Sequence, residues 1–304
     1  MNQRQTASFL KRKLHEIGVS PSSRHGQNFL IDLNLVELLA RTAAIGPDDV
    51  VLEVGTGTGS LTCMFADQAA AVVTVEIDAN LHALASEVLV GRDNVVMLHQ
   101  DALKNKNQIH ANVLTAVADA LAAGTDRKFK LAANLPYSIA TPLISNLLLE
   151  ATAPISMTVT IQKELADRIV AKPRTKDYSA LSVWVQNTCR AEIVRIMPPT
   201  VFWPRPKVDS AIIHINVDEE KRSALRDLKF FHEFVRAMFF HRRKFLRSEL
   251  LSAFKKTLDK PQVDSIMEEM QISMKARAEE LEPHQFVELC HAVLDRIPEN
   301  FKIL

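Results

Sequence analysis

Short apolar runs alternate with longer amphipathic stretches over the first two thirds of the chain. The short runs, most of them rich in β-branched residues, cover 50–54, 72–76, 95–99, 129–134, 155–162, 191–196 and 208–217. Segments between the first five, such as 81–90 and 142–150, are long enough for crossover helices. The pattern therefore predicts an α/β fold with a mostly parallel seven-stranded sheet covered on both faces. Four prolines and no helix separate the last two runs, which predicts a hairpin-like antiparallel edge.

The pattern changes near residue 230, where strand signals stop. Apolar residues then recur at helical spacing, first as Phe231, Phe234 and Met238 and later as Phe286 and Leu289. A polar run at 218–223 interrupts the apolar pattern just before this change. We therefore expect an N-terminal basic helix and linker at 1–24, a main domain at 25–218 and a small all-helical domain at 223–304.

Composition is that of an ordinary globular protein. The chain has 304 residues, which is long enough for two domains. Its residues are 47% hydrophobic and 24% charged, unlike those of disordered or disulfide-rich proteins. Cys63, Cys189 and Cys290 are scattered, so neither a zinc site nor a disulfide framework is indicated and a reducing cytoplasm fits best. No apolar run approaches the roughly 20 residues that span a bilayer, so no membrane association is expected.

Positive charge is concentrated in one segment, although the net charge is only +1. Residues 221–256 hold eleven basic and three acidic residues, a local excess of eight positive charges. Such a run is most often a solvated helical face. It favours nucleic-acid binding only when other features point the same way.

Three of the eight glycines, Gly55, Gly57 and Gly59, directly follow the first predicted strand. Glycine permits a sharp turn and lets a ligand approach the backbone. Glu76 ends the second strand, where a carboxylate can accept the hydroxyl protons of a ribose, and Asp101 follows the third, where it can accept from an adenine amino group. Together they predict an adenosine-bearing cofactor. A dinucleotide remains possible on these residues alone.

The segment 134–137, with the sequence Asn-Leu-Pro-Tyr, follows the fourth strand and indicates the chemistry. An exocyclic adenine nitrogen is a poor nucleophile, because its lone pair is delocalised into the ring. The Asn134 side-chain oxygen and a backbone carbonyl at Leu135 or Pro136 could accept its two N–H bonds and aim the lone pair at a methyl donor. Tyr137 could stack on the extruded base. A plain strand-ending turn is the alternative interpretation.

At this point the sequence closely resembles the ribosomal RNA adenine dimethyltransferases, the KsgA-type family, over nearly its whole length. The landmarks are 26–30, 53–59, 75–78, 100–102, the Asn-Leu-Pro-Tyr segment, the Phe-Trp-Pro-Arg-Pro-Lys-Val-Asp-Ser run at 202–210, and Arg242, Arg243, Lys244, Arg247, Ser248 and 277–279. The resemblance implies a Rossmann-like class I methyltransferase fold with a small all-helical C-terminal domain.

The resemblance also implies the site. The expected contacts to S-adenosylmethionine are Gln27, Asn28, Leu30, Gly55, Gly57, Glu76, Ile77, Asp101, Ala102 and Asn134. Residues 134–137 would hold the target adenine, with Phe202 a candidate for stacking on its other face. Arg242, Arg243, Lys244 and Arg247 would bind RNA, and no metal is expected.

The substrate implied by the resemblance is a pair of adjacent adenosines in the 3′-terminal hairpin of small-subunit ribosomal RNA, each methylated twice. A monomer that assists late assembly of the immature small subunit is expected. Two positions depart from the bacterial pattern, Ser138 in place of asparagine and Ala140 in place of serine, which puts the efficiency or order of methyl transfer in question. The stretch 104–127 looks long and suggests a surface elaboration.

Three other functions compete with this reading. A large-subunit ribosomal RNA methyltransferase is the close enzymatic rival, but 202–210 and the Arg-Ala-Glu segment at 277–279 favour the small-subunit branch. A binding protein that checks assembly with vestigial catalysis would not need an intact Asn134 and Tyr137. A DNA adenine methyltransferase shares the need to extrude a base, and the basic segment does not choose between DNA and RNA.

Overall fold

The computed structural model describes residues 12–14, 16, 18, 27–298, 301 and 303. The basic helix and linker expected at 1–24 therefore lie largely outside the described residues. The chain forms two compact units, one comprising residues up to 166 together with 192–217, and the other comprising 167–191 together with 218–304.

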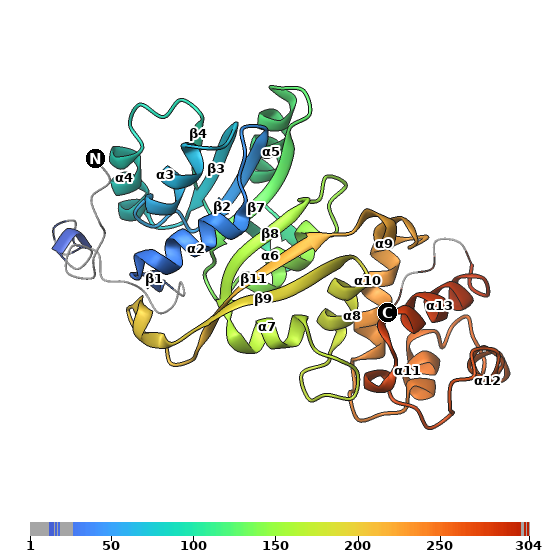
Figure 1. Ribbon diagram of the computed structural model, residues 1–304. Helices are drawn as coiled ribbons and strands as arrows, with labels where there is room; N and C mark the ends of the chain where they lie inside the picture. Colours follow the sequence, from blue (N-terminus) through green and yellow to red (C-terminus); the bar gives the residue numbers. More distant parts are fainter. Residues whose placement is uncertain are drawn as a thin grey trace. The chain divides into compact units, whose positions relative to one another are not determined.

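The first unit is built on a seven-stranded sheet (Figure 1). In spatial order its strands are β4 (Val95–His99), β3 (Ala71–Glu76), β2 (Asp49–Val54), β7 (Lys128–Asn134), β8 (Ser156–Gln162), β11 (Ser210–Val217) and β9 (Cys189–Met197). The pairs among the first five strands are parallel. The sixth, β11, runs antiparallel to β8. The predicted mostly parallel sheet with an antiparallel edge is confirmed.

Helices cover both faces of this sheet, which explains why its central strands are apolar throughout. Every residue of β2 and of β3 is buried, as expected of parallel strands packed on two sides. The covering helices are α2 (Leu33–Ala43), α3 (Ser60–Ala66), α4 (Ala79–Val88), α5 (Ala111–Ala122) and α6 (Ala140–Leu147). Side chains of α2 and α3 share one core cluster with Val51 and Ile212. Figure 1 shows these two helices in front of the sheet and α5 behind it.

Helix α5 corrects the reading of 104–127 as a surface elaboration. The segment contains a small hairpin, β5 (Leu103–Asn105) with β6 (Gln108–Ile109), followed by α5. The helix packs on β2, β3 and β7 and buries Val113 and Val117. It is the crossover between β4 and β7 and belongs to the core. Its helical spacing of apolar residues is weak, because alanines and polar residues surround the two buried valines.

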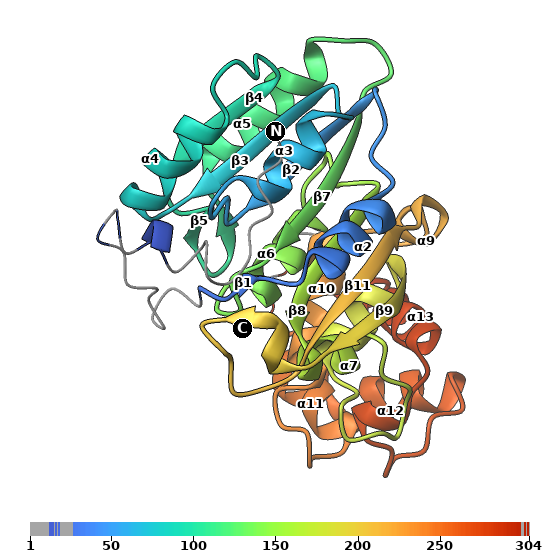
Figure 2. The same cartoon turned by 60° about the vertical axis from the view of Figure 1, so that its left-hand side comes forward.

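A second small ribbon, absent from the predicted elements, joins distant parts of the first unit. Strand β1 (Phe29–Leu30) pairs antiparallel with β10 (Phe202–Trp203), which follows the short 3₁₀ turn η2 (Pro199–Val201). The Phe29 and Trp203 rings stack with centroids 6.4 Å apart. Figure 2 shows the blue β1 beside the yellow loop that carries β10. Two-residue strands leave too little pattern for detection from sequence.

The order of the strands places the site. The chain runs outward from β2 to β3 and β4, then returns to β7 on the other side of β2. In open α/β sheets the crevice at such a reversal, outside the carboxyl ends of the strands, is where ligands bind. The glycine loop after β2, the carboxyl end of β3 and residues 134–137 after β7 all lie at this edge.

The second unit is helical, as the apolar spacing predicted. Its helices are α8 (Ala180–Gln186), α9 (Glu219–Ser223), α10 (Leu228–Met238), α11 (Leu246–Ala253), α12 (Lys260–Glu269) and α13 (Pro283–Leu294), with the 3₁₀ turn η3 (Ala278–Glu280). Helix α7 (Lys163–Ile169) spans the boundary between the units. Phe231, Phe234, Met238, Phe286 and Leu289 are all buried.

Residues 167–191 lie within the range 25–218 that the sequence suggested for one domain, yet they pack with the helical unit. Trp184 of α8 is 1% exposed, with its ring centroid 6.3 Å from that of Phe231. Tyr178 is fully buried and donates a hydrogen bond to the Leu281 carbonyl. This segment supplies large core side chains to the second unit. The functional roles given to the three ranges stay predictions.

Candidate active site

The glycine loop has the tight geometry that its composition suggested. Gly55, Gly57 and Gly59 all have positive φ, at 90°, 58° and 77°. A Cβ on Gly57 would lie 3.2 Å from a ring carbon of Phe29, and one on Gly55 would lie 3.3 Å from Pro136 Cδ. Side chains at these positions would therefore add strain and fill the space between the loop and its two neighbours.

Glu76 is fixed at the carboxyl end of β3 by its backbone surroundings. Its side chain is 5% exposed and accepts hydrogen bonds from the N–H groups of Gly57 at 2.9 Å and of Ile77 and Asp78 at 3.0 Å. Burial raises the pKa of this carboxyl, and the backbone donors oppose that shift. The carboxylate thus ties the glycine loop to β3, and Oε2, which accepts only one of the three bonds, keeps a lone pair for a ligand.

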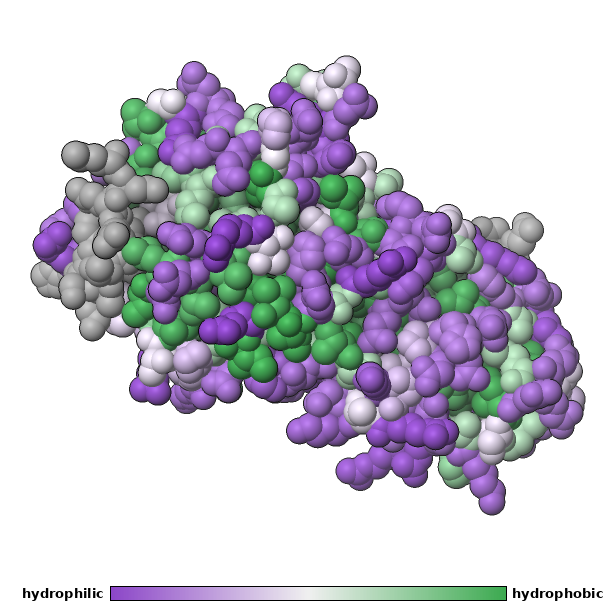
Figure 3. Space-filling view, in the orientation of Figure 1, coloured by the Kyte–Doolittle hydropathy of each residue, from purple (hydrophilic) through white to green (hydrophobic). Residues whose placement is uncertain are grey.

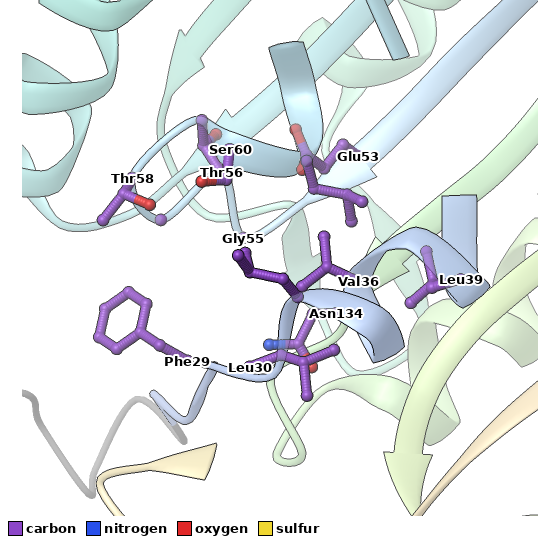
Figure 4. Close-up of a pocket in the computed structure, with 13 residues that line it drawn as sticks. Phe29, Leu30, Val36, Leu39, Glu53, Gly55, Thr56, Thr58, Ser60 and Asn134 are labelled. Carbon is purple, nitrogen blue, oxygen red and sulfur yellow. The ribbon is translucent and has the colours of Figure 1, made fainter. Parts of the chain in front are cut away.

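Three cavities meet at Gly55, and together they form one crevice at this edge of the sheet. Twelve predicted site residues line at least one of them: Gln27, Asn28, Leu30, Gly55, Gly57, Glu76, Ile77, Asp101, Ala102, Asn134, Leu135 and Pro136. Figure 4 shows Phe29 and Leu30 across the cavity from Thr56 and Thr58 of the glycine loop, with Asn134 beside Leu30. The structure therefore brings the predicted cofactor residues together.

Asp101 stands at the far end of this crevice, after β4. One of its oxygens accepts a hydrogen bond from the Leu103 N–H at 2.9 Å. The side chain is exposed and lines the same cavity as Glu76 and Ala102. Ser138 lines this cavity too, whereas Ala140 is buried at the start of α6.

The Asn134 amide is oriented by one contact. Its Nδ2 donates to the backbone carbonyl of Asn28 at 2.8 Å. A carbonyl can only accept, so this bond determines which way the amide faces and leaves Oδ1 as an acceptor. In the turn that follows, the Pro136 carbonyl accepts from the Ile139 N–H at 3.2 Å. No donor to the Leu135 carbonyl is found within the described part of the chain, so Leu135 is the better placed second acceptor.

Tyr137 is held through its hydroxyl. Its Oη lies 2.5 Å from Oγ of Ser210, a fully buried residue that begins β11. Burial raises the pKa of the Tyr137 phenol, while the serine bond lowers it. The hydroxyl is therefore protonated at neutral pH and serves to anchor the ring. This contact joins the 202–210 run to the Asn-Leu-Pro-Tyr segment, a link that was not visible in the sequence.

Phe202 departs from the expected stacking role. It is 2% exposed and packs in the core cluster with Met197 and Ile212, opposite Leu30 in the small ribbon. It lines none of the three cavities among the described residues. In this arrangement Phe202 has no face open to a base, because the β1–β10 pairing directs its ring into the core. Its neighbour Trp203 is half-buried and stacks on Phe29.

Glu53 is a site residue that sequence reasoning passed over, although it stands in the landmark 53–59. It lines the cavity of Figure 4 and is 1% exposed. Its carboxyl accepts from the hydroxyls of Thr62 at 2.5 Å and Thr74 at 2.7 Å, and Thr74 also bonds to Thr56 at 2.6 Å. Burial raises the pKa of Glu53 to about 8, against the effect of both threonine bonds.

Two of the four predicted RNA-binding side chains have partners inside the second unit. Arg242 donates to a Glu279 carboxylate oxygen at 2.6 Å and to the carbonyls of Thr175 and Lys176. Arg247 forms a two-pronged ion pair with Asp264, at 2.5 and 2.8 Å. These contacts take three of the five N–H donors of Arg242 and two of those of Arg247, so both arginines connect segments of the second unit.

Arg243 and Lys244 differ from these two arginines. Both are exposed, and neither side chain has a hydrogen bond or ion pair with any residue in the described ranges. On the face in Figure 3, hydrophilic side chains cover most of the second unit. These two cations are thus the better candidates for contact with an external anion.

Among the described residues no group of three or more histidine, cysteine and acidic side chains is arranged to hold a metal ion. None of the helices that the structure describes is long and apolar enough to cross a membrane.

Comparisons with known proteins agree with this geometry. Residues 20–293 match the family described as ribosomal RNA adenine dimethylase. Ribosomal RNA small subunit methyltransferase A of Geobacillus thermodenitrificans is 38% identical over 285 residues, which cover 93% of this chain and 94% of that protein.

Two solved structures share the fold. A dimethyladenosine transferase from Plasmodium falciparum superposes with a TM-score of 0.73 at 22% identity, covering 87% of this chain and 97% of that one. The 23S rRNA methyltransferase ErmE superposes with a TM-score of 0.60 at 27% identity, covering 87% and 98%. With the family match spanning most of its length, this chain belongs to the ribosomal RNA adenine dimethylase family and is an adenine dimethyltransferase with a Rossmann-like fold.

Proposed function

We propose that this enzyme uses S-adenosylmethionine to dimethylate N6 of two adjacent adenosines in the 3′-terminal hairpin of small-subunit ribosomal RNA. It acts as a cytoplasmic monomer on the immature particle and assists late assembly. The 38% identity to a protein named as a small subunit methyltransferase supports the choice of subunit. The observation that carries the chemistry is the hydrogen bond from Asn134 to the Asn28 carbonyl, which leaves the amide oxygen free to accept.

The residues of the crevice fit this cofactor. Glu76 and Asp101 offer carboxylate oxygens to ribose hydroxyls and to an adenine amino group, respectively, at the ends of neighbouring strands. The glycine loop leaves open the space that a Cβ at Gly55 or Gly57 would enter. When bound, S-adenosylmethionine supplies an electrophilic methyl group on a positively charged sulfur.

The remaining work falls to residues 134–137. Asn134 Oδ1 and the Leu135 carbonyl accept the two N–H bonds of the adenine amino group, which turns the nitrogen lone pair away from the ring and toward the methyl carbon. Tyr137 holds the base by stacking, with its ring fixed through Ser210. As the new N–C bond forms, the bond between the methyl carbon and sulfur breaks, and the amino nitrogen, which now carries the positive charge, releases one proton to solvent. A strong general base is not needed.

Replacement of Asn134 by alanine tests this mechanism. We expect kcat to fall by roughly 10²- to 10³-fold with little change in RNA affinity, because only positioning in the transition state is lost. The measurement is single-turnover methylation of small subunits from a strain that lacks the enzyme. Asn80→Ala is the matched control, since Asn80 is exposed on α4 and lines none of the three cavities. Full activity in Asn134→Ala would refute the assignment.

Mass-spectrometric mapping of the product tests the substrate. We expect dimethyladenosine at two adjacent positions of the 3′ hairpin of the small-subunit RNA. Methyl groups on large-subunit RNA or on duplex DNA would support the rival enzymes instead. If Asn134→Ala restores subunit maturation fully while methylation is lost, the assembly role does not depend on catalysis.

A further inference from the structure

The turn between α10 and α11, residues 239–245, presents a large aromatic ring to solvent. Phe240 is 78% exposed, and Phe245 at the end of the turn is 43% exposed. The preceding Phe239 behaves differently, with its ring centroid 6.0 Å from that of Tyr178 and 5.6 Å from that of Phe286. Phe240 meets the ring of its neighbour His241 edge-on, with centroids 4.7 Å apart, but stays largely exposed. Burial in the core of the unit therefore does not explain the large ring at position 240.

Several hydrogen bonds hold the turn that carries Phe240 in place. Arg242 binds the Glu279 carboxylate and the carbonyls of Thr175 and Lys176. The Lys244 N–H donates to the His241 carbonyl at 2.9 Å, and the Leu246 N–H donates to the Ala276 carbonyl at 2.8 Å. The ring is thus displayed from a turn tied at several points, so little ordering is needed when a partner binds.

Exposed cations surround this turn from two distant parts of the sequence. Arg243 and Lys244 belong to the turn itself. Lys172, Arg174 and Lys176 belong to the loop whose carbonyls Arg242 binds, and all three are exposed. None of these five side chains is paired with a carboxylate among the residues that the structure describes. The loop at 172–176 was not part of the predicted basic segment, because tertiary contacts bring it there.

We propose that Phe240 is a stacking platform for one unpaired base of the RNA, with the cations of this surface holding the flanking phosphates. The proposal rests on the proposed function, which makes RNA the substrate. A single-stranded nucleotide joins a flat base to an anionic phosphate, and an aromatic ring among unpaired cations matches both. An uncharged apolar protein surface would account for the ring but not for the five unpaired cations.

Binding of the full-length protein to two RNAs tests the proposal. Fluorescence anisotropy at several salt concentrations compares a single strand of about 12 nucleotides with a duplex of the same length. We expect Phe240→Ala to weaken single-strand binding roughly five- to a hundredfold, with duplex binding and the salt dependence unchanged. Phe240→Trp should retain affinity, and Phe240→Leu should lose it despite its apolar side chain. Arg243→Ala is the contrasting control, which should weaken both RNAs and reduce the salt slope by about one.

Several results would overturn the proposal. These are equal affinity of Phe240→Ala and wild type for the single strand, an equal loss on the duplex, or wild-type affinity in Phe240→Leu, which would show that an apolar side chain suffices without stacking. A wild-type protein that binds the single strand no better than the duplex would overturn it as well. Methylation of small subunits, measured in parallel, separates the two ideas. Its absence in wild type contradicts the proposed function, whereas normal methylation with unaltered binding by Phe240→Ala contradicts only the stacking role.

Discussion

At the scale of single residues, the segment 134–137, for which we propose catalysis, depends on partners that restrict its side chains. Asn134 is turned by the Asn28 carbonyl, and Tyr137 is tied to Ser210. Both partners come from segments more than 70 residues away along the chain. Residue chemistry alone suggested the roles that we propose for Asn134 and Tyr137, but the orientation of the two side chains depends on neighbours that the fold provides.

Ser210→Ala should lower kcat about tenfold and leave the melting temperature nearly unchanged, because the Tyr137 ring loses its anchor while the core keeps its volume. Tyr137→Phe should lower kcat by a similar factor. The double variant should have the same kcat as either single variant, because all three proteins lack the same hydrogen bond. Ser210→Thr keeps a hydroxyl and should restore part of kcat. Steady-state methylation and a double-mutant cycle provide the measurement. Additive losses, or a change in KM alone, would contradict the positioning role.

At the scale of elements, Glu53 connects three of them beneath the glycine loop. Glu53 lies near the carboxyl end of β2. Its side chain accepts hydrogen bonds from the hydroxyls of Thr62 in α3 and Thr74 in β3. A buried carboxyl with two hydroxyl donors is stable mainly in its neutral form, since burial dominates its raised pKa. The junction that shapes the cofactor cavity is therefore sensitive to pH.

The sign of that sensitivity follows from the two states of the chain. Below pH 4.5, the ordinary pKa of the group, Glu53 is neutral in both the folded and the unfolded chain. Its full contribution to the free energy of unfolding is then present. Between pH 4.5 and about 8 only the unfolded chain ionises, so the free energy of unfolding falls as pH rises, by up to about 1.4 kcal/mol per unit. Above about pH 8 Glu53 is ionised in both states, and its contribution to the free energy of unfolding is lost.

Glu53→Gln should remove this dependence, because an amide does not titrate. Between pH 5.5 and 8 we expect the free energy of unfolding of wild type to fall more steeply than that of the variant, by up to about 3 kcal/mol. Urea unfolding at both pH values measures the difference. Parallel curves for the two proteins would show that Glu53 is ionised in the folded state.

At the scale of the whole molecule, the two compact units do not correspond to two continuous stretches of chain. The helical unit takes 167–191 from the middle of the sequence. Two of the largest fully buried side chains, Trp184 and Tyr178, come from that excursion. The polar run at 218–223 marks where the chain enters the helical unit for the second time. No such run marks its first entry, at residue 167.

A fragment of residues 218–304 should therefore fail to fold cooperatively, because the places of Trp184 and Tyr178 in its core would be empty. We expect poor dispersion of its amide signals in NMR and no sharp thermal transition. As a control, Trp184→Ala in the full chain should cost about 3–5 kcal/mol of stability. A well-dispersed spectrum for the fragment would show that 167–191 is dispensable.

Much of this protein was determined by local sequence. Strands β2, β3 and β8 were the most clearly predictable, because runs rich in β-branched residues and buried on both faces leave a strong pattern. Gly55, Glu76, Asp101 and Asn134 were predictable as a group because the ends of parallel strands converge at one edge. What the tertiary structure decided depends on long-range contacts with no local pattern. These contacts bury Phe202, occupy Arg242 and Arg247, anchor Tyr137 on Ser210, and bring the loop at 172–176 beside the turn that exposes Phe240.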